Sequence, residues 1–178
     1  YIGGTDTRKR VVDIVNAFNI AKGRGVDISL VFAGNEFRNL KKLPDLAARL
    51  AIASSPFKND IHLLGFVSDA QKKGLLNNAL VFVFCTVYEG FGLPILEAMA
   101  SSCPVISYTN SSIKETAGTA ALLVRTGDYV GVAEQIQNIY SDNDLRDQLI
   151  KSGLKQSDKF SWPKTAKSFL SSIDDTLT

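Results

Sequence analysis

The segment LVFVFCTVYEGFGLPILEAMASSCPVISY, residues 80–108, decides the fold of this chain. It opens with an apolar run, LVFVFC, whose β-branched and aromatic residues are typical of a buried strand. A loop with two glycines follows, then the helix-like stretch LPILEAMASS and a second apolar run, PVISY. Two buried strands joined by a helix predict a parallel pair with a right-handed crossover.

The same alternation continues on both sides of this segment. Further apolar runs begin at Tyr1 and lie at 27–34, 61–65 and 120–124. Helical patterns cover 11–20, 43–54, 68–79, 93–102 and 113–118, followed by a helical tail from about 128 that we expect to break near Gly153 and Pro163. This order predicts an α/β domain with a single doubly wound, Rossmann-like parallel sheet of about six strands. Ligands of such sheets bind at the carboxyl ends of the strands.

Bulk composition suits one globular domain and excludes several classes of protein. A length of 178 residues with 45% hydrophobic and 21% charged residues is ordinary for a soluble domain. The formal net charge of +2 is too small to indicate nucleic-acid binding. No run approaches the roughly 20 apolar residues of a membrane span. The opening YIGGTDTRKR does not have the pattern of a signal peptide, so we expect a cytoplasmic protein.

Further expectations come from individual residues. Tyr1 lies in what looks like a strand already under way, so we expect the sequence to be a fragment cut at a domain boundary. Cys85 and Cys103 lie in apolar runs, which favours two buried, reduced thiols. With a single histidine, His62, and no paired-cysteine spacing, the sequence contains no recognisable metal motif. The Asp-Asn-Asp triplet at 142–144 precedes a helical pattern and is interpreted as a helix cap.

The loop after LVFVFC has the composition of an anion site. Gly90 and Gly92 allow the backbone to approach a ligand closely, and Pro94 suits the first turn of a helix. We expect the N–H groups of Gly92, Leu93 and Ile95 to point out of the helix start, where they would suit a diphosphate. The alternative is an ordinary strand–turn–helix junction, which also favours glycine and proline.

Two glutamates flank this loop. Glu97 follows about one helical turn inside the helix, where its carboxylate can accept hydrogen bonds from two neighbouring ribose hydroxyls. Glu89 precedes the helix and can hold sugar hydroxyls. The alternative for Glu97 is a plain surface residue.

This combination resembles the retaining glycosyltransferases of family four, which have the GT-B fold. The resemblance rests on the two glutamates flanking GFGLPIL, on the opening YIGGTDTRKR, on LLGFVSDAQ and on FSW at 160–162, and it extends from Tyr1 to about Phe169. It implies that residues 1–178 form the C-terminal, nucleotide-sugar-binding half of a GT-B enzyme. The N-terminal domain, which binds the acceptor, would be absent from this sequence.

The resemblance also assigns roles to residues. It implies that the first glutamate contacts the donor sugar, the second binds the ribose, a basic pair neutralises the diphosphate, and the loop at 66–67 borders the base. The residues so assigned to catalysis are Glu89, Lys9 and Arg8, and those assigned to donor binding are Gly4, Phe66, Val67, Gly90, Phe91, Gly92, Leu93 and Glu97. Many family members have arginine at the position of Gly4, so the resemblance implies either that Arg8 does that work or that the diphosphate is bound more weakly. Ser111 and Ser112 lie where the family has a loop near the donor.

The implied function is transfer of a hexose, with retention, from a nucleoside diphosphate sugar such as a GDP- or UDP-sugar. No cofactor or metal is implied, because basic residues would stabilise the leaving diphosphate. The RK-type loop favours a mannosyltransferase-like enzyme of polysaccharide or glycoconjugate synthesis, with a glycan or lipid-linked acceptor. Peripheral contact of the full-length protein with the inner face of the membrane stays open. The alternative is a catalytically inactive nucleotide-sugar-binding or interaction module. In either case we expect this chain alone to bind donor weakly and not to turn over.

Overall fold

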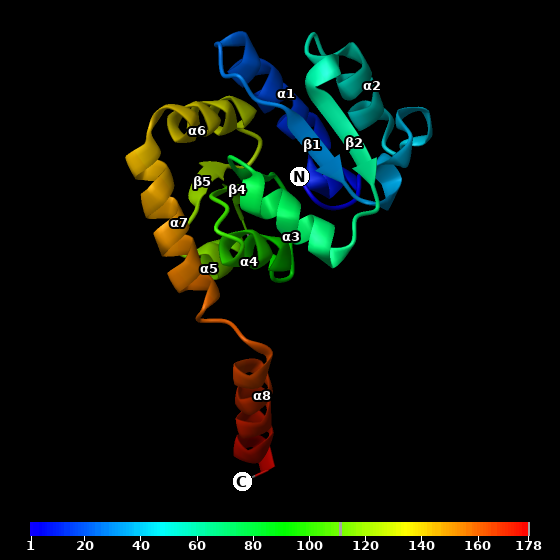
Figure 1. Ribbon diagram of the computed structural model, residues 1–178. Coiled ribbons are helices and arrows are strands. Elements are labelled where there is room, and N and C mark those ends of the chain that lie inside the picture. Colours follow the sequence, from blue (N-terminus) through cyan, green and yellow to red (C-terminus); the bar gives the residue numbers. More distant parts are fainter. Residues whose placement is uncertain (111, 178) are drawn as a thin grey trace.

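The computed structural model describes residues 1–110 and 112–177 and has the predicted α/β architecture (Figure 1). Its strands are all parallel to their neighbours and form two sheets, one with the order β1–β2 and one with the order β3–β4–β5. The strands are β1 (Leu30–Ala33), β2 (Ile61–Gly65), β3 (Phe82–Phe84), β4 (Val105–Thr109) and β5 (Leu122–Arg125).

Helices follow the strands in alternation, as predicted. The α-helices are α1 (Val11–Gly23), α2 (Leu46–Ser54), α3 (Asp69–Asn78), α4 (Leu93–Ala100), α5 (Ile113–Ala117), α6 (Tyr129–Ser141), α7 (Asn143–Ser157) and α8 (Trp162–Leu177). Short 3-10 helices are η1 (Thr7–Lys9), η2 (Asn35–Arg38), η3 (Leu40–Lys42) and η4 (Lys58–Asp60). Side-chain caps fix several starts: Ser68 and Gln71 form a capping box on α3, and Asp142 caps α7 as predicted.

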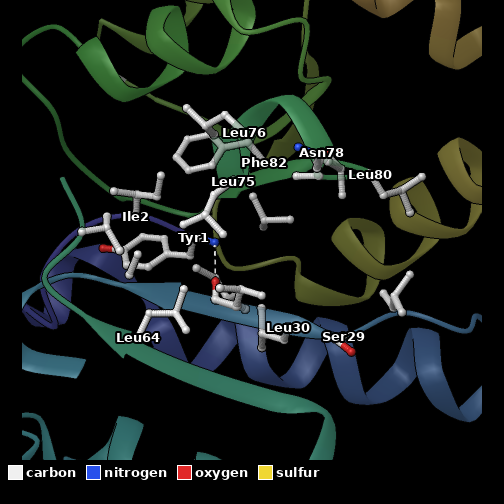
Figure 2. A pocket seen from close by; sticks show the side chains of 18 of the residues that line it. Tyr1, Ile2, Ser29, Leu30, Leu64, Leu75, Leu76, Asn78, Leu80 and Phe82 are labelled. Atoms are coloured by element: carbon white, nitrogen blue, oxygen red, sulfur yellow. Dashed lines mark hydrogen bonds between the residues drawn. The ribbon is translucent and has the colours of Figure 1, made fainter. Parts of the chain in front are cut away.

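The strand count differs from the prediction of one sheet of about six strands. The first predicted strand is reduced to a single parallel bridge between Ile2 and Ala33. Its backbone bonds run from Gly3 N to Ala33 O and from Ala33 N to Tyr1 O. On the edge of β1 that faces away from β2, only these few of the described residues pair, and in the described chain no ladder joins them to β3. The two sheets are therefore separated at this point by a groove (Figure 2).

Of the two breaks predicted in the helical tail, the one near Pro163 is confirmed and the one near Gly153 is wrong. Gly153 lies inside α7 and is buried, and a Cβ atom there would lie 3.2 Å from Cγ of Met99 in α4. Glycine at this position therefore lets α7 pack closely on α4. The tail instead breaks at Asp142, between α6 and α7, and again at 158–161, ahead of Pro163 in the first turn of α8. Helix α8 extends away from the rest of the molecule (Figure 1).

Cys85 and Cys103 are free and fully packed in the core, in agreement with the prediction of buried thiols. Burial raises the pKa of both thiols, that of Cys103 to about 12. We expect Cys103 to react with iodoacetamide roughly 10³-fold more slowly in the folded protein than in denaturant, because the thiolate is the reactive form. Mass spectrometry of alkylated samples measures this rate. Equal rates in the folded and denatured protein would contradict the buried placement.

Candidate functional site

Most of the predicted site residues gather where the strands end. The segment after Tyr1–Gly3 forms η1, the loop at 85–92 follows β3, and residue 112 follows β4. Because parallel strands present their carboxyl ends at one edge, these three loops meet there. The hydrogen bond from Val87 N to Arg8 O, 2.8 Å long, joins the first two loops directly.

Glu89 is the centre of this meeting point. Its Oε1 accepts hydrogen bonds from Nζ of Lys9 and from Nη1 of Arg8, the second at 3.2 Å. Oγ1 of Thr86 lies 3.1 Å from the same oxygen. Arg8 Nη1 also donates to the carbonyl of Tyr88 at 3.1 Å. The structure therefore brings together the three side chains that the sequence assigned to catalysis.

The basic pair differs in its exposure to solvent. The side chain of Lys9 is only 15% exposed and Glu89 only 14%, whereas Arg8 is 43% exposed. Lys9 also lies with Nζ 5.0 Å from the centroid of the Phe84 ring, a cation–π arrangement. Partial burial strengthens the electrostatic interaction of a charge with a ligand, because less water screens it. Lys9 is thus the better shielded cation of the pair.

The first loop is held in shape by a carboxylate that the sequence did not reveal. Glu36 of η2 accepts hydrogen bonds from both the backbone N–H and Oγ1 of Thr5, each at 2.5 Å. A Cβ atom on Gly4 would lie 3.4 Å from the carboxylate of Glu36, and the carbonyl of Gly4 accepts a bond from Oη of Tyr1. Glycine at position 4 thus leaves room for the Glu36 carboxylate, which binds the next residue along the loop.

The third basic residue of the loop faces the core instead of the site. Arg10 adopts a left-handed conformation, with φ 51°, at the start of α1. Its guanidinium donates from Nε and Nη2 to the two carboxylate oxygens of Asp13, at 2.9 and 3.0 Å. Oη of Tyr108 in β4 donates to the same carboxylate at 2.7 Å, within the core. This network raises the pKa of Arg10 and ties η1 and α1 to β4.

The start of α4 forms as predicted, with one correction. Gly92 caps the helix with φ 91°, and a Cβ atom there would lie 2.9 Å from Cδ1 of Ile113, so only glycine fits without strain. The N–H of Ile95 is not directed out of the helix, because it donates to the carbonyl of Gly92 at 2.9 Å. Among the described residues no acceptor bonds to the N–H of Gly92 or Leu93, so these two remain for an anion.

Helix α5 holds the glycine-rich loop through hydroxyl groups. Oγ1 of Thr116 donates to the carbonyl of Phe91, and Oγ of Ser112 donates to the carbonyl of Glu89 at 2.9 Å. The prediction for Ser111 lies outside the described residues, while Ser112 supports the backbone of the site. The ring of Phe91 packs edge-on against Phe160, with centroids 5.6 Å apart.

Glu97 forms a second cluster with α3. Its Oε1 accepts a hydrogen bond from Nζ of Lys72 at 2.8 Å, and Lys72 also pairs with Asp69 at 3.4 Å. The Glu97 side chain is 43% exposed, so it remains accessible to a ligand. Phe66, 64% exposed, and Val67 precede α3 on the loop after β2. Lys72 was not foreseen, because nothing in its neighbours marks it as a partner of Glu97.

Within residues 1–110 and 112–177, no group of three or more histidine, cysteine, aspartate and glutamate side chains is placed to hold a metal ion. No helix in the same ranges is long and apolar enough to cross a membrane.

Comparison of the sequence with known proteins gives consistent matches. Residues 1–156 match the family model described as glycosyl transferases group 1. The chain is 31% identical over 166 residues to O-antigen chain mannosyltransferase B of Escherichia coli, covering 91% of this chain and 42% of that protein. It is 29% identical to the capsular polysaccharide biosynthesis glycosyltransferase CapM of Staphylococcus aureus, covering 90% and 41%. The chain thus spans about two-fifths of the length of these curated relatives.

Solved structures show the same fold at lower sequence identity. Sucrose-phosphate synthase from Thermosynechococcus elongatus superposes with a TM-score of 0.83 at 22% identity, over 98% of this chain and 44% of that one. HepE from Anabaena in complex with UDP-glucose superposes with a TM-score of 0.82 at 16% identity, over 98% and 47%. Both matches cover nearly all of this chain.

Proposed function

This chain belongs to the glycosyl transferases group 1 family, and from that membership we propose that residues 1–178 form the C-terminal, donor-binding domain of a hexosyltransferase. The observation that carries the proposal is the convergence of Arg8, Lys9 and Glu89 beside the start of α4. This edge of the parallel sheet presents two cations, a carboxylate, and helix amides that bond to no acceptor among the described residues. These groups suit a sugar attached to a diphosphate. The acceptor would bind to an N-terminal domain outside this sequence.

Charge development explains why these groups would favour the reaction. When the bond between sugar and diphosphate breaks, negative charge grows on the leaving diphosphate. That charge would be stabilised more in the transition state than in the ground state. The stabilising groups would be the side chains of Lys9 and Arg8 and the N–H groups of Gly92 and Leu93. Because the protein supplies this positive charge itself, we propose a metal-independent mechanism with no cofactor.

The two carboxylates would hold the remainder of the donor. In the proposed complex Glu89 contacts the sugar hydroxyls, Glu97 accepts hydrogen bonds from the ribose, and Phe66 and Val67 border the base. Gly4, Gly90 and Phe91 would complete the backbone around the diphosphate and sugar. Retention of configuration is supported by the resemblance to family four. The complex of HepE with UDP-glucose supports a nucleoside diphosphate sugar as donor, for which we propose a GDP- or UDP-sugar. The names of the two relatives above support a role in surface polysaccharide synthesis.

A ligand screen of the 178-residue chain tests donor binding. Ligands that bind the native state raise its stability by RT ln(1 + [L]/Kd), so weak binding is visible at millimolar concentration. We expect UDP or GDP and one of their sugars to raise the melting temperature, while the corresponding nucleosides do not. Equal shifts with nucleoside and nucleoside diphosphate would overturn the assignment of Arg8 and Lys9 to the diphosphate.

A substitution at Glu89 distinguishes the proposed enzyme from the competing hypothesis, an inactive binding module. In the full-length protein we expect Glu89→Ala to abolish most sugar transfer, and Glu134→Ala, at an exposed position on α6, to leave it unchanged. Transfer at near-normal rate by Glu89→Ala would remove Glu89 from the catalytic group. Absence of transfer by the unmodified protein with every donor that binds would favour the inactive module.

Lys72 should act as a positioning residue for the nucleoside. Its Nζ bonds to Oε1 of Glu97 and so orients the carboxylate, whose other oxygen can accept from the ribose. We expect Lys72→Met to weaken nucleoside diphosphate binding about 2- to 5-fold, since surface pairs are worth about 1 kcal/mol or less. Calorimetry measures this loss, with Lys73→Met, an exposed neighbour on the same helix, as control. Equal affinities of the two variants would exclude the role.

A further inference from the structure

Both cations that are proposed for the diphosphate also pair with a carboxylate of the protein. Oε1 of Glu89 accepts hydrogen bonds from Nζ of Lys9 and from Nη1 of Arg8, the second at 3.2 Å. The side chains of Lys9 and Glu89 are only 15% and 14% exposed, so water screens their interaction incompletely. A diphosphate that binds to Lys9 and Arg8 therefore has to share both cations with Glu89.

The sharing opposes the binding of an anion. The diphosphate and the carboxylate of Glu89 carry like charges, and like charges placed side by side in a partly buried site cost binding free energy. Arg8 also has a second carboxylate partner, because Oδ1 of Asp6 lies 3.5 Å from its Nε. Glu89 therefore weakens the binding of a diphosphate that brings no hydrogen-bond donors of its own.

The carboxylate of Glu89 is held beside the two cations by neighbouring groups. Oγ1 of Thr86, a residue that is only 1% exposed, lies 3.1 Å from Oε1 of Glu89. Nδ2 of Asn110 donates to the carbonyl of Thr86, and Oγ of Ser112 donates to the carbonyl of Glu89 at 2.9 Å. These bonds restrict the movement by which the carboxylate would otherwise avoid a diphosphate.

A sugar attached to the diphosphate changes this balance. An ionised carboxylate is only an acceptor, and the hydroxyl groups of a hexose are donors. In the proposed function, on which this inference rests, Glu89 contacts those hydroxyls. The hydroxyls then replace the bonds that Lys9 and Arg8 divert to the diphosphate, because hydrogen bonds to a charged group are strong. The nucleoside diphosphate that remains after transfer has lost these donors.

We propose that Glu89 makes the site discriminate between the intact donor and the nucleoside diphosphate product. It lowers the affinity for the diphosphate, and only the sugar hydroxyls compensate for this loss. The same carboxylate that contacts the sugar before transfer would therefore favour release of the product after transfer.

Calorimetric titrations of the 178-residue chain with UDP, GDP, UDP-glucose and GDP-mannose test the proposal. We expect the unmodified chain to bind a nucleotide sugar at least about 3-fold more tightly than the matching nucleoside diphosphate. Glu89→Gln keeps the shape of the side chain without its charge. We expect it to bind the nucleoside diphosphate about 5- to 10-fold more tightly than the unmodified chain and to lose the preference for the sugar. Glu89→Ala should change both affinities in the same directions.

The matched control is Asp6→Asn, which removes an equal charge from the other carboxylate partner of Arg8. It should change the affinities for the nucleoside diphosphate and its sugar by the same factor. Nucleoside diphosphate binding that is equal or weaker in both Glu89 variants would overturn the proposal, as would a preference for the sugar that survives in them. The proposed function would stand in these cases. It would fail, together with this inference, if the unmodified chain bound UDP and GDP no more tightly than uridine and guanosine.

Discussion

A full-length enzyme with methionine in place of Lys9 is expected to transfer sugar about 10²–10³-fold more slowly at saturating donor. Lys9 is the less exposed of the two cations beside Glu89, and methionine keeps much of its length without its charge. The leaving diphosphate would lose its better shielded cation, while Glu89 would lose a partner and repel the diphosphate. Steady-state kinetics with the donor identified by the ligand screen measure kcat and KM separately.

The control for this experiment is Lys73→Met, which removes an equal charge from an exposed position on α3. It should leave kcat within about twofold of the unmodified enzyme, since exposed charges contribute little. If Lys9→Met raised KM alone and left kcat unchanged, Lys9 would bind the donor equally in ground and transition states. The assignment of Lys9 to catalysis would then be wrong.

The largest expected effect on stability comes from Arg10→Met. Removing the guanidinium would leave the carboxylate of Asp13, only 3% exposed, with Oη of Tyr108 as its remaining side-chain donor. Breaking a buried ion pair on one side costs about 3–5 kcal/mol, and we expect about 3 kcal/mol because Arg10 itself is 46% exposed. Urea denaturation measures the loss.

Arg24→Met serves as the matched control, because Arg24 is exposed at the end of α1 and no side-chain bond of it is seen in the described residues. Its effect should stay within about 0.5 kcal/mol. A loss below about 1 kcal/mol for Arg10→Met would mean that Asp13 does not depend on Arg10 in the folded protein.

Local pattern predicted the elements well. The buried strands at residues 82–84 and 105–109 and the helix between them follow from apolar runs interrupted by Gly92 and Pro94. The local pattern could not predict the division into two sheets, because strand order depends on pairing between segments that are distant in the sequence. The supposed break at Gly153 failed for a similar reason, because the contact with Met99 favours glycine there.

The resemblance predicted the charged residues at the centre of the candidate site. It did not predict the residues that hold them and the neighbouring loop in place. Glu89, Arg8 and Lys9 were assigned from the resemblance, and the structure places them in contact. Lys72 and Thr116 were missed because their partners lie 25 residues away in the sequence. Such partners leave no local periodicity or motif, so only the folded arrangement reveals them. The prediction for Ile95 was wrong in the opposite sense. The local pattern suggested that its N–H group points out of the helix, whereas this group donates to the carbonyl of Gly92.

The proposed diphosphate site is tested most directly by an NMR titration of the ¹⁵N-labelled 178-residue chain with a nucleoside diphosphate. We predict that the backbone amides of Arg8, Lys9, Gly92 and Leu93 shift together and saturate with one affinity. We also predict that these shifts are lost in Lys9→Met at the same ligand concentration. Shifts of amides elsewhere in the chain, with Gly92 and Leu93 unchanged, would contradict the placement of the diphosphate between η1 and α4.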